Sequence, residues 1–168
     1  MEIRKAEEGD IPAIVGLYDQ ARRALRAAGV DQWQEDYPNG EDAKTDIAAG
    51  TGYVLEDEGK VIATACLGFG HEPTYNEIWD GGWQGVGEYC YLHRVAVAEE
   101  AKGRGAAGLF FEELKRQARA RGIKILRGDT HPDNHSMQRV MAKNGLTHRG
   151  TIRVEDGSLR MAFEALLE

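Results

Sequence analysis

A glycine-rich turn between a predicted strand and a predicted helix most constrains the fold of this chain. An apolar strand pattern covers Gly87–Val97, the charged turn Glu99–Gly105 follows, and a helical pattern runs over Ala106–Arg121 until Gly122. The short apolar run Ile123–Gly128 is the next predicted strand. Because a crossover helix of this length connects parallel neighbours, the segment predicts a β-α-β unit.

The rest of the chain predicts hairpin strands and further helices. Asp57-Glu58-Gly59 and Glu155-Asp156-Gly157 are hairpin turns between apolar runs. Asp10 and Pro12 are the predicted N-cap and first-turn residues of the first helix. Further strands are expected at 2–6, 52–56, 60–69, 146–154 and 158–166, and helices at 11–28, 40–49 and 133–143. The order β-α-α-β-β-β-α-β-α-β-β predicts an α/β fold with a mixed sheet and helices on both faces.

Length and composition limit the class of protein. The chain has 168 residues, 42% of them hydrophobic, which fits one folded domain over 1–168. Its formal net charge of −7 argues against a nucleic-acid partner, because the phosphate backbone requires a basic surface. The first residues form no apolar signal segment, and no apolar run approaches the ~20 residues that span a bilayer. We therefore expect no membrane partner and a cytoplasmic location.

The glycine-rich turn has the properties of a phosphate-binding loop. Free N–H groups at the start of a helix bind phosphate, and glycine lets the backbone approach the oxygens closely. Lys102 and Arg104 add positive charge beside Gly103 and Gly105. Together with Gly108 these glycines also match G-x-G-x-x-G, which keeps a dinucleotide site open as an alternative. A charged run between strand and turn argues against that alternative, since a dinucleotide-binding turn leaves its strand directly.

The turn resembles the acyl-CoA pyrophosphate motif Q/R-x-x-G-x-G/A of the GNAT superfamily of N-acyltransferases, with Lys102 at the first position. Downstream, Asn134 and Asn144-Gly145 resemble the family's N-x-x-A-x-x-L-Y-x-K-x-G-F segment. The resemblance covers about residues 87–150 well and the whole chain loosely. It implies a mostly antiparallel, splayed sheet, a single acyl-CoA N-acyltransferase domain, and acetyl-CoA or coenzyme A as cosubstrate. The residues that it implies for cosubstrate binding are Val95, Ala96, Val97, Lys102, Gly103, Arg104, Gly105, Ala106, Ala107 and Asn134, with Ser136 and Arg139 as further candidates.

Three candidate catalytic residues lie along the strand before the turn. Acyl transfer to an amine calls for a base, polarisation of the thioester, and an acid for the leaving thiolate. Histidine is the side chain that most readily takes up a proton near neutral pH, and His93 shares strand parity with Val95, whose main-chain N–H is the oxyanion donor implied by the resemblance. Tyr91 is a candidate acid and Glu88 a candidate base through water, although all three also fit ordinary packing or a surface position. The family's frequent tyrosine falls at Met141, which cannot donate a proton.

Other side chains give weaker signals. His131 and His135 could bind zinc, but Pro132 breaks the regular spacing, so no metal is expected. Cys66 and Cys90 lie in apolar runs and are expected to be buried, reduced thiols. Aromatic and acidic side chains in two irregular segments fit either an acceptor site for a cationic amine or a local aromatic core. They are Trp33, Tyr37, Tyr75, Trp79 and Trp83, with Glu35, Asp36, Glu72, Glu77 and Asp80.

The sequence therefore predicts transfer of an acetyl group from acetyl-CoA to a primary amine of a small molecule or peptide, by direct attack in a ternary complex. No covalent enzyme intermediate is required, because neither cysteine has a recognisable base partner. A non-catalytic acyl-CoA sensor on the same fold and a dinucleotide-binding oxidoreductase remain as alternatives. Homodimers are common in the family, so a homodimer is among the expected partners.

Overall fold

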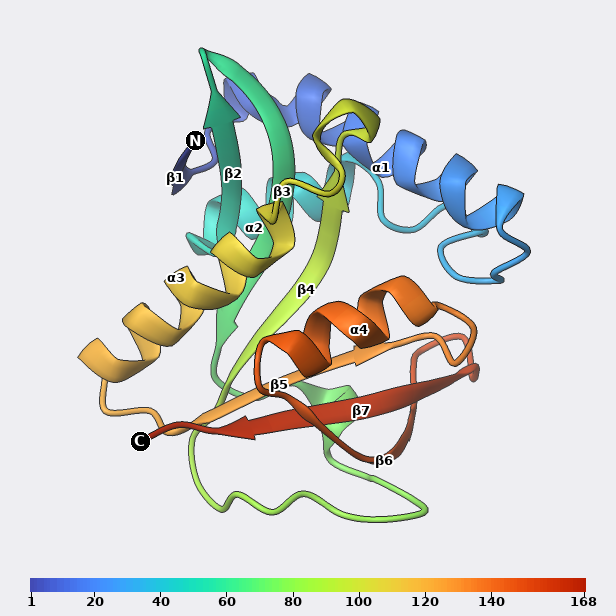
Figure 1. Ribbon diagram of the computed structural model, residues 1–168, viewed down its shortest axis with the longest axis vertical. Helices are drawn as coiled ribbons and strands as arrows, with labels where there is room; N and C mark the ends of the chain where they lie inside the picture. The colour runs from blue at the N-terminus through green and yellow to red at the C-terminus, as the bar shows by residue number, and fades with distance from the viewer. The chain divides into compact units, whose positions relative to one another are not determined.

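The computed structural model describes all of residues 1–168, which form one seven-stranded sheet and four α-helices (Figure 1). The strands are hydrogen-bonded in the order β1-β2-β3-β4-β5-β7-β6. They are β1 (Glu2–Lys5), β2 (Gly52–Asp57), β3 (Lys60–Phe69), β4 (Cys90–Val97), β5 (Ile125–Thr130), β6 (Thr147–Arg153) and β7 (Leu159–Leu166). The α-helices are α1 (Ile11–Ala27), α2 (Gly40–Ala49), α3 (Ala106–Ala120) and α4 (His135–Lys143), and the short 3-10 helices are η1 (Glu8–Asp10), η2 (Pro73–Tyr75) and η3 (Glu99–Ala101). The predicted order of strands and α-helices is confirmed.

The strand registers confirm a mixed, mostly antiparallel sheet. The pairs β1–β2, β2–β3, β5–β7 and β6–β7 are antiparallel. β4 and β5 run parallel, as the crossover helix predicts, and their register joins Cys90 to Leu126 and Tyr91 to Arg127. β4 continues to Val97, beyond the two residues that pair with β5. The main-chain groups on the β5 side of the later part of β4 therefore have no partner in this register.

The chain comprises two compact units. The first is Met1–Leu67 with His93–Glu113, and the second is Gly68–Leu92 with Leu114–Glu168. β3, β4 and α3 each contribute residues to both units. None of the helices is both long enough and apolar enough to cross a bilayer.

In the first unit, α1 and α2 pack together and α2 contacts β2. Figure 1 draws α2 behind β2 and β3, and the first half of α3 in front of them. The apolar spacing of α1 turns Ile14, Leu17 and Tyr18 into the core. Asn39 caps α2 by accepting hydrogen bonds from two N–H groups of its first turn, and Gly50 ends the helix in the left-handed conformation.

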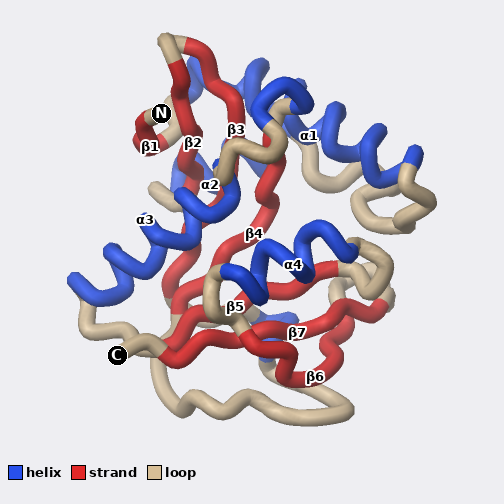
Figure 2. The backbone as a smooth tube through the Cα atoms, viewed as in Figure 1, coloured by secondary structure: helices blue, strands red, loops and turns tan.

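In the second unit, the segment between β3 and β4 places aromatic side chains in the core. The core cluster contains Tyr75, Tyr89, Ile125, Ile152 and Ala162, with Trp83 packed against it. Figure 1 draws α4 in front of β5 and β7 and η2 behind them, and Figure 2 shows the long loop that follows η2. The interpretation of Tyr75 and Trp83 as part of a local aromatic core is therefore confirmed.

Several element boundaries differ from the prediction. β4 begins at Cys90 rather than Gly87, whose φ of +122° does not continue a strand. β5 begins two residues late because the N–H of Ile123 still bonds back to the last turn of α3, at the carbonyl of Ala118. α4 begins at His135, since the preceding asparagine is its N-cap.

The start of α1 also differs from the prediction. Asp10 makes no side-chain cap to α1. Its carboxylate instead accepts a hydrogen bond from the N–H of Glu7 at 2.7 Å and pairs with Arg4 at 2.8 Å. Arg4 also pairs with Glu56 at 2.7 Å, so these side chains join β1 to η1 and β2. The hydrogen bonds from Arg4 and the Glu7 N–H lower the pKa of Asp10.

Candidate functional site

The turn between β4 and α3 is an exposed loop of left-handed glycines. After η3, Gly103 and Gly105 have φ values of +80° and +78°. Nothing lies within 4 Å of the Cβ position of either glycine, so conformation and not crowding calls for glycine there. The helix then begins at the buried Ala106, and its first turn is made of small residues.

The start of α3 offers main-chain donors and two cations to an anion. The N–H of Leu109 bonds to the carbonyl of Gly105, so the N–H groups of the three preceding residues have no acceptor within the helix. Lys102 pairs with Glu99 at 2.9 Å, and its side chain is 48% exposed. Exposed pairs of this kind contribute only ~0–1 kcal/mol, so a phosphate can displace the carboxylate.

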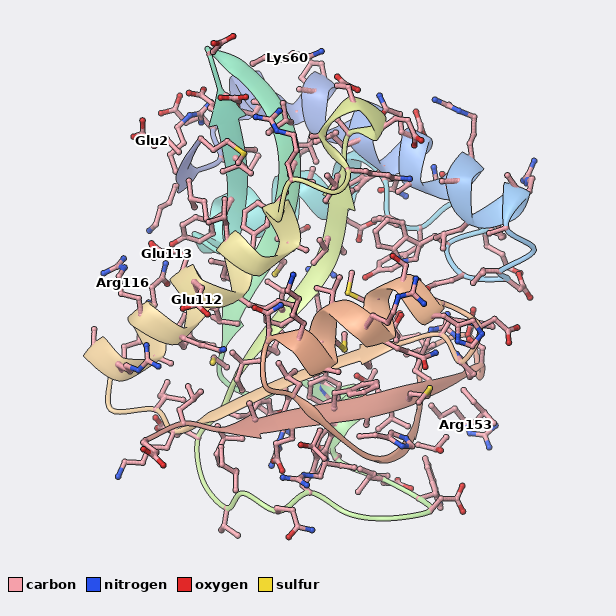
Figure 3. The ribbon with its side chains drawn as sticks, viewed as in Figure 1. Glu2, Lys60, Glu112, Glu113, Arg116 and Arg153 are labelled. Atoms are coloured by element: carbon pink, nitrogen blue, oxygen red, sulfur yellow. The ribbon has the colours of Figure 1, made fainter.

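Arg104 pairs across the turn with the end of β2. Its Nη2 lies 2.5 Å from Oδ2 of Asp57, and the Arg104 side chain is 44% exposed. The hydrogen bond from Arg104 lowers the pKa of Asp57, which keeps that carboxylate charged. A second pair, Lys60 with Glu100 at 2.7 Å, joins the tip of the β2–β3 hairpin to η3, and Figure 3 shows Lys60 at that tip. The turn is thus held by surface ion pairs on both of its sides.

β4 has a left-handed residue in its middle. Arg94 has a φ of +52°, in a strand where the neighbouring residues are extended. Its guanidinium reaches Asp46 of α2, with Nε 2.9 Å from Oδ2 and Nη2 2.6 Å from Oδ1. Its Nη1 donates to the hydroxyl of Tyr37 at 2.7 Å. The predicted cosubstrate residues Val95 and Val97 follow directly and are half-buried, while Ala96 between them is buried.

The structure places the three predicted catalytic residues in different surroundings. His93 is half-buried on β4, in the first unit. Tyr91 is half-buried on the same strand but belongs to the second unit, where its ring occupies the space that a side chain at Gly68 would fill. Glu88 is exposed and precedes β4, so the prediction that places it within the strand is wrong. The catalytic roles of all three stay predictions.

The remaining predicted residues lie on α4 in the second unit. The side chain of Asn134 accepts a hydrogen bond from the N–H of Met137 at 3.1 Å, so it is the N-cap of this helix. Ser136 and Arg139 are exposed. Met141 is buried, and its Cε lies 3.3 Å from the Cβ position of Gly128. Met141, where the resemblance places the family's tyrosine, is therefore a core residue in this chain.

A buried carboxylate in the second unit has no counterpart in the predictions. The side chain of Glu164 is 0% exposed and pairs with Arg127 at 3.0 Å and Arg149 at 3.1 Å. It also accepts hydrogen bonds from the N–H groups of Gln84 and Gly85. The Arg127 guanidinium stacks on the rings of Trp83 and Tyr89 as well. These contacts hold the loop before β4 against the sheet. No local sequence pattern predicts contacts between residues so far apart in the chain.

Tyr75 and Asp129 form a second pair that the sequence does not reveal. The Tyr75 hydroxyl donates to Oδ2 of Asp129 at 2.7 Å. Burial, reinforced by this carboxylate, raises the pKa of Tyr75 well above its ordinary value, so the tyrosine stays protonated. No group of three or more histidine, cysteine, aspartate or glutamate side chains is arranged to hold a metal ion.

Comparison with known proteins shows which family model the chain matches and which solved structures have a similar fold. A model of the acetyltransferase (GNAT) family matches residues 16–146. A crystal structure of a GNAT-family acetyltransferase from Streptococcus agalactiae is 32% identical, with a TM-score of 0.90 over 99% of this chain and 95% of that one. A GNAT-family acetyltransferase from Listeria monocytogenes has the same fold at 17% identity, with a TM-score of 0.75 over 99% and 94% of the two chains. So does a Salmonella typhimurium protein solved with its cofactor acetyl-CoA, at 20% identity and a TM-score of 0.70 over 100% and 94%. No curated protein sequence is similar enough to count as a match.

Proposed function

The chain belongs to the acetyltransferase (GNAT) family, and on that premise we propose that it transfers an acetyl group from acetyl-CoA to a primary amine of a small molecule or peptide. The acetyl group passes directly to the amine in a ternary complex. The observation that carries this proposal is the exposed turn that opens α3 with two left-handed glycines and two cations. We also propose that residues 1–168 act as one acetyltransferase domain in the cytoplasm, where the free thiols Cys66 and Cys90 stay reduced.

The turn suits the diphosphate of acetyl-CoA. In this proposal the N–H groups of Gly103, Gly105 and the first turn of α3 donate to phosphate oxygens, and Lys102 and Arg104 add charge. The main chain of Val95–Val97 pairs with the extended arm of the cosubstrate, using groups that have no partner in the β4–β5 register. Three further residues remain secondary candidates for cosubstrate binding. Asn134 is the N-cap of α4, and Ser136 and Arg139 lie exposed on that helix.

Acetyl-CoA supplies an activated thioester, so the new amide bond forms as the carbon–sulfur bond breaks. The chain must remove a proton from the amine, polarise the carbonyl and return a proton to the sulfur. We assign the first task to His93, directly or with Glu88 through water, and the third to Tyr91. The N–H of Val95 donates to the carbonyl oxygen as negative charge develops there. Met141 takes no part, because a thioether cannot donate a proton and this one is buried.

The test is release of free coenzyme A thiol from acetyl-CoA over a panel of small primary amines and peptides with free N-termini. We expect thiol release that depends on an amine and yields the N-acetylated product by mass spectrometry. His93→Ala should lower kcat by about 100-fold while the Kd of coenzyme A stays unchanged. His148→Ala, an exposed histidine on β6, is the matched control and should keep its kcat. An unchanged kcat for His93→Ala across the pH range would remove His93 from the mechanism.

The cosubstrate turn has its own pair of variants. Lys102→Ala removes an exposed cation that is paired with a carboxylate at 2.9 Å. Because the proposal gives it a phosphate contact, we expect the acetyl-CoA KM to rise about 3–10-fold with kcat nearly unchanged. Lys44→Ala removes a similar exposed pair, with Glu41 on α2, and should leave both constants unchanged. Equal behaviour of the two variants would contradict the assignment of the turn to the cosubstrate.

A further inference from the structure

We propose that Arg94 is a positioning residue for acetyl transfer. Its guanidinium, fixed by Asp46 and Tyr37, holds the main chain of β4 in the left-handed conformation and thereby sets the direction of the Val95 N–H. The inference rests on the proposed function, because it explains how the predicted oxyanion donor is held in place.

The backbone conformation of Arg94 has to be maintained by other contacts. A φ of +52° is unfavourable for a residue with a Cβ, and it is rare inside a strand. Such conformations persist where the surrounding structure over-determines them, and they cluster at functional sites. A residue of this kind interrupts the regular pleat and turns the following peptide group away from the direction it would have in a straight strand. The following peptide group here carries the Val95 N–H.

The side-chain contacts of Arg94 are specific enough to maintain it. Two of its nitrogens meet the two oxygens of Asp46 at 2.9 and 2.6 Å, which is the bidentate geometry that arginine provides and lysine does not. The two side chains are only 17% and 10% exposed, so water screens the pair weakly. The third contact, to the Tyr37 hydroxyl at 2.7 Å, brings in the segment between α1 and α2.

Asp46 is itself held firmly. It lies near the end of α2, and its carbonyl accepts the N–H of Thr51 at 2.9 Å. Its Cβ lies 3.3 Å from the Cβ position of Gly52, the first residue of β2, so a side chain at Gly52 would crowd it. All these groups belong to the first unit, together with Val95 and the cosubstrate turn. The guanidinium therefore connects a fixed helix end to one peptide group of β4.

The test compares Arg94→Lys with Arg4→Lys. Arg4 also makes a bidentate pair, with Asp10 at 2.8 and 2.9 Å, but it lies on the edge strand β1. Arg94→Lys should lower kcat by at least about 10-fold and leave the acetyl-CoA KM within about threefold, because the cosubstrate turn is untouched. Arg4→Lys should keep its kcat, even where its melting temperature falls as far as that of Arg94→Lys.

A second readout does not depend on turnover. The amide resonance of Val95 in a ¹H–¹⁵N spectrum should move in Arg94→Lys, and in wild type it should shift on addition of coenzyme A. Tyr37→Phe keeps the ion pair and therefore the fold, and we expect it to shift the same resonance by less and to lower kcat by about two- to fivefold. If Arg94→Lys does not fold, the Val95 resonance and the kcat of Tyr37→Phe test the positioning role of Arg94.

The inference and the proposed function fail in distinguishable ways. A wild-type enzyme that acetylates amines, with Arg94→Lys and Tyr37→Phe at the wild-type kcat and with an unmoved Val95 resonance, would overturn the inference alone. A wild-type chain that releases no thiol with any amine would overturn the proposed function. The Val95 resonance of the two variants would then decide whether Arg94 sets the backbone.

Discussion

At the scale of single residues, the two cysteines are the clearest test of burial. Burial raises the pKa of Cys66 to about 11 and that of Cys90 to about 12. At pH 8 a thiol with a pKa near 11 has roughly 200 times less thiolate than one with the ordinary value near ~8.5. We therefore expect iodoacetamide to label neither cysteine in the native protein, and both in urea. The measurement is intact-mass spectrometry over time at pH 8.

The same experiment also tests the direct-attack mechanism. If an acetyl group passed through a cysteine, that thiol would have to form a thiolate in the native protein. Rapid native labelling of Cys66 or Cys90, with loss of acetyl transfer, would contradict both the burial and the mechanism. The expected result is that neither cysteine is labelled in the native protein and that acetyl transfer keeps its full activity.

Individual residues also show where sequence reasoning reaches its limit. The glycines of the turn are predictable, because a left-handed backbone favours glycine and the motif is local. Arg94 is not, since its left-handed conformation is associated with a contact to Asp46, 48 positions earlier in the chain. The sequence pattern places Glu88 within the strand, but β4 begins only at Cys90, after Gly87 with its φ of +122°. Local patterns therefore predict the turn, whereas long-range contacts decide the geometry of the strand beside it.

At the scale of elements, Glu164 holds the loop before β4 on the sheet of the second unit. It lies on β7, and its carboxylate receives hydrogen bonds from Arg127, Arg149 and the N–H of Gln84. Glu164→Ala would leave Arg127 buried without its carboxylate, which typically costs about 3–5 kcal/mol. We expect a loss of that size in the free energy of unfolding, measured with urea. Glu155→Ala, at an exposed turn, should change it by less than about 0.5 kcal/mol.

Proteolysis gives a local readout for the same substitution. The loop contains Glu77 and Glu88, both exposed, and a glutamate-specific protease can cut there once the backbone opens. We expect faster cleavage at these sites in Glu164→Ala under native conditions, before global unfolding. Cleavage at the wild-type rate, together with unchanged stability, would show that the loop does not depend on Glu164.

The elements themselves are largely predictable from the sequence. β3 and α2 begin and end at the predicted residues, because hairpin turns and apolar spacing mark them locally. The parallel β4–β5 pair follows from the length of the crossover helix. The contact between Glu164 and Arg127 spans 37 positions and could not be predicted, since pairing of distant charges leaves no periodic pattern. The same holds for Tyr75 and Asp129.

At the scale of the whole molecule, the two compact units are not independent along the chain. Their boundaries fall at 67/68 within β3, at 92/93 within β4 and at 113/114 within α3. Unfolding one unit would therefore remove part of two strands and a helix that also belong to the other. Elements that are shared in this way favour a single cooperative transition. These shared elements support the proposal that residues 1–168 act as one domain.

Ligand binding should shift that single transition as a whole. A ligand at about 100 times its Kd stabilises the folded state by about 2.7 kcal/mol. For a chain of this size that corresponds to a rise in melting temperature of roughly 5–11 °C. We expect acetyl-CoA and coenzyme A to produce it in scanning calorimetry, and NAD and NADP to produce none, because η3 separates β4 from the glycine turn. Two transitions of which one moves would contradict the single domain, and a shift with NAD would contradict the acyl-CoA site.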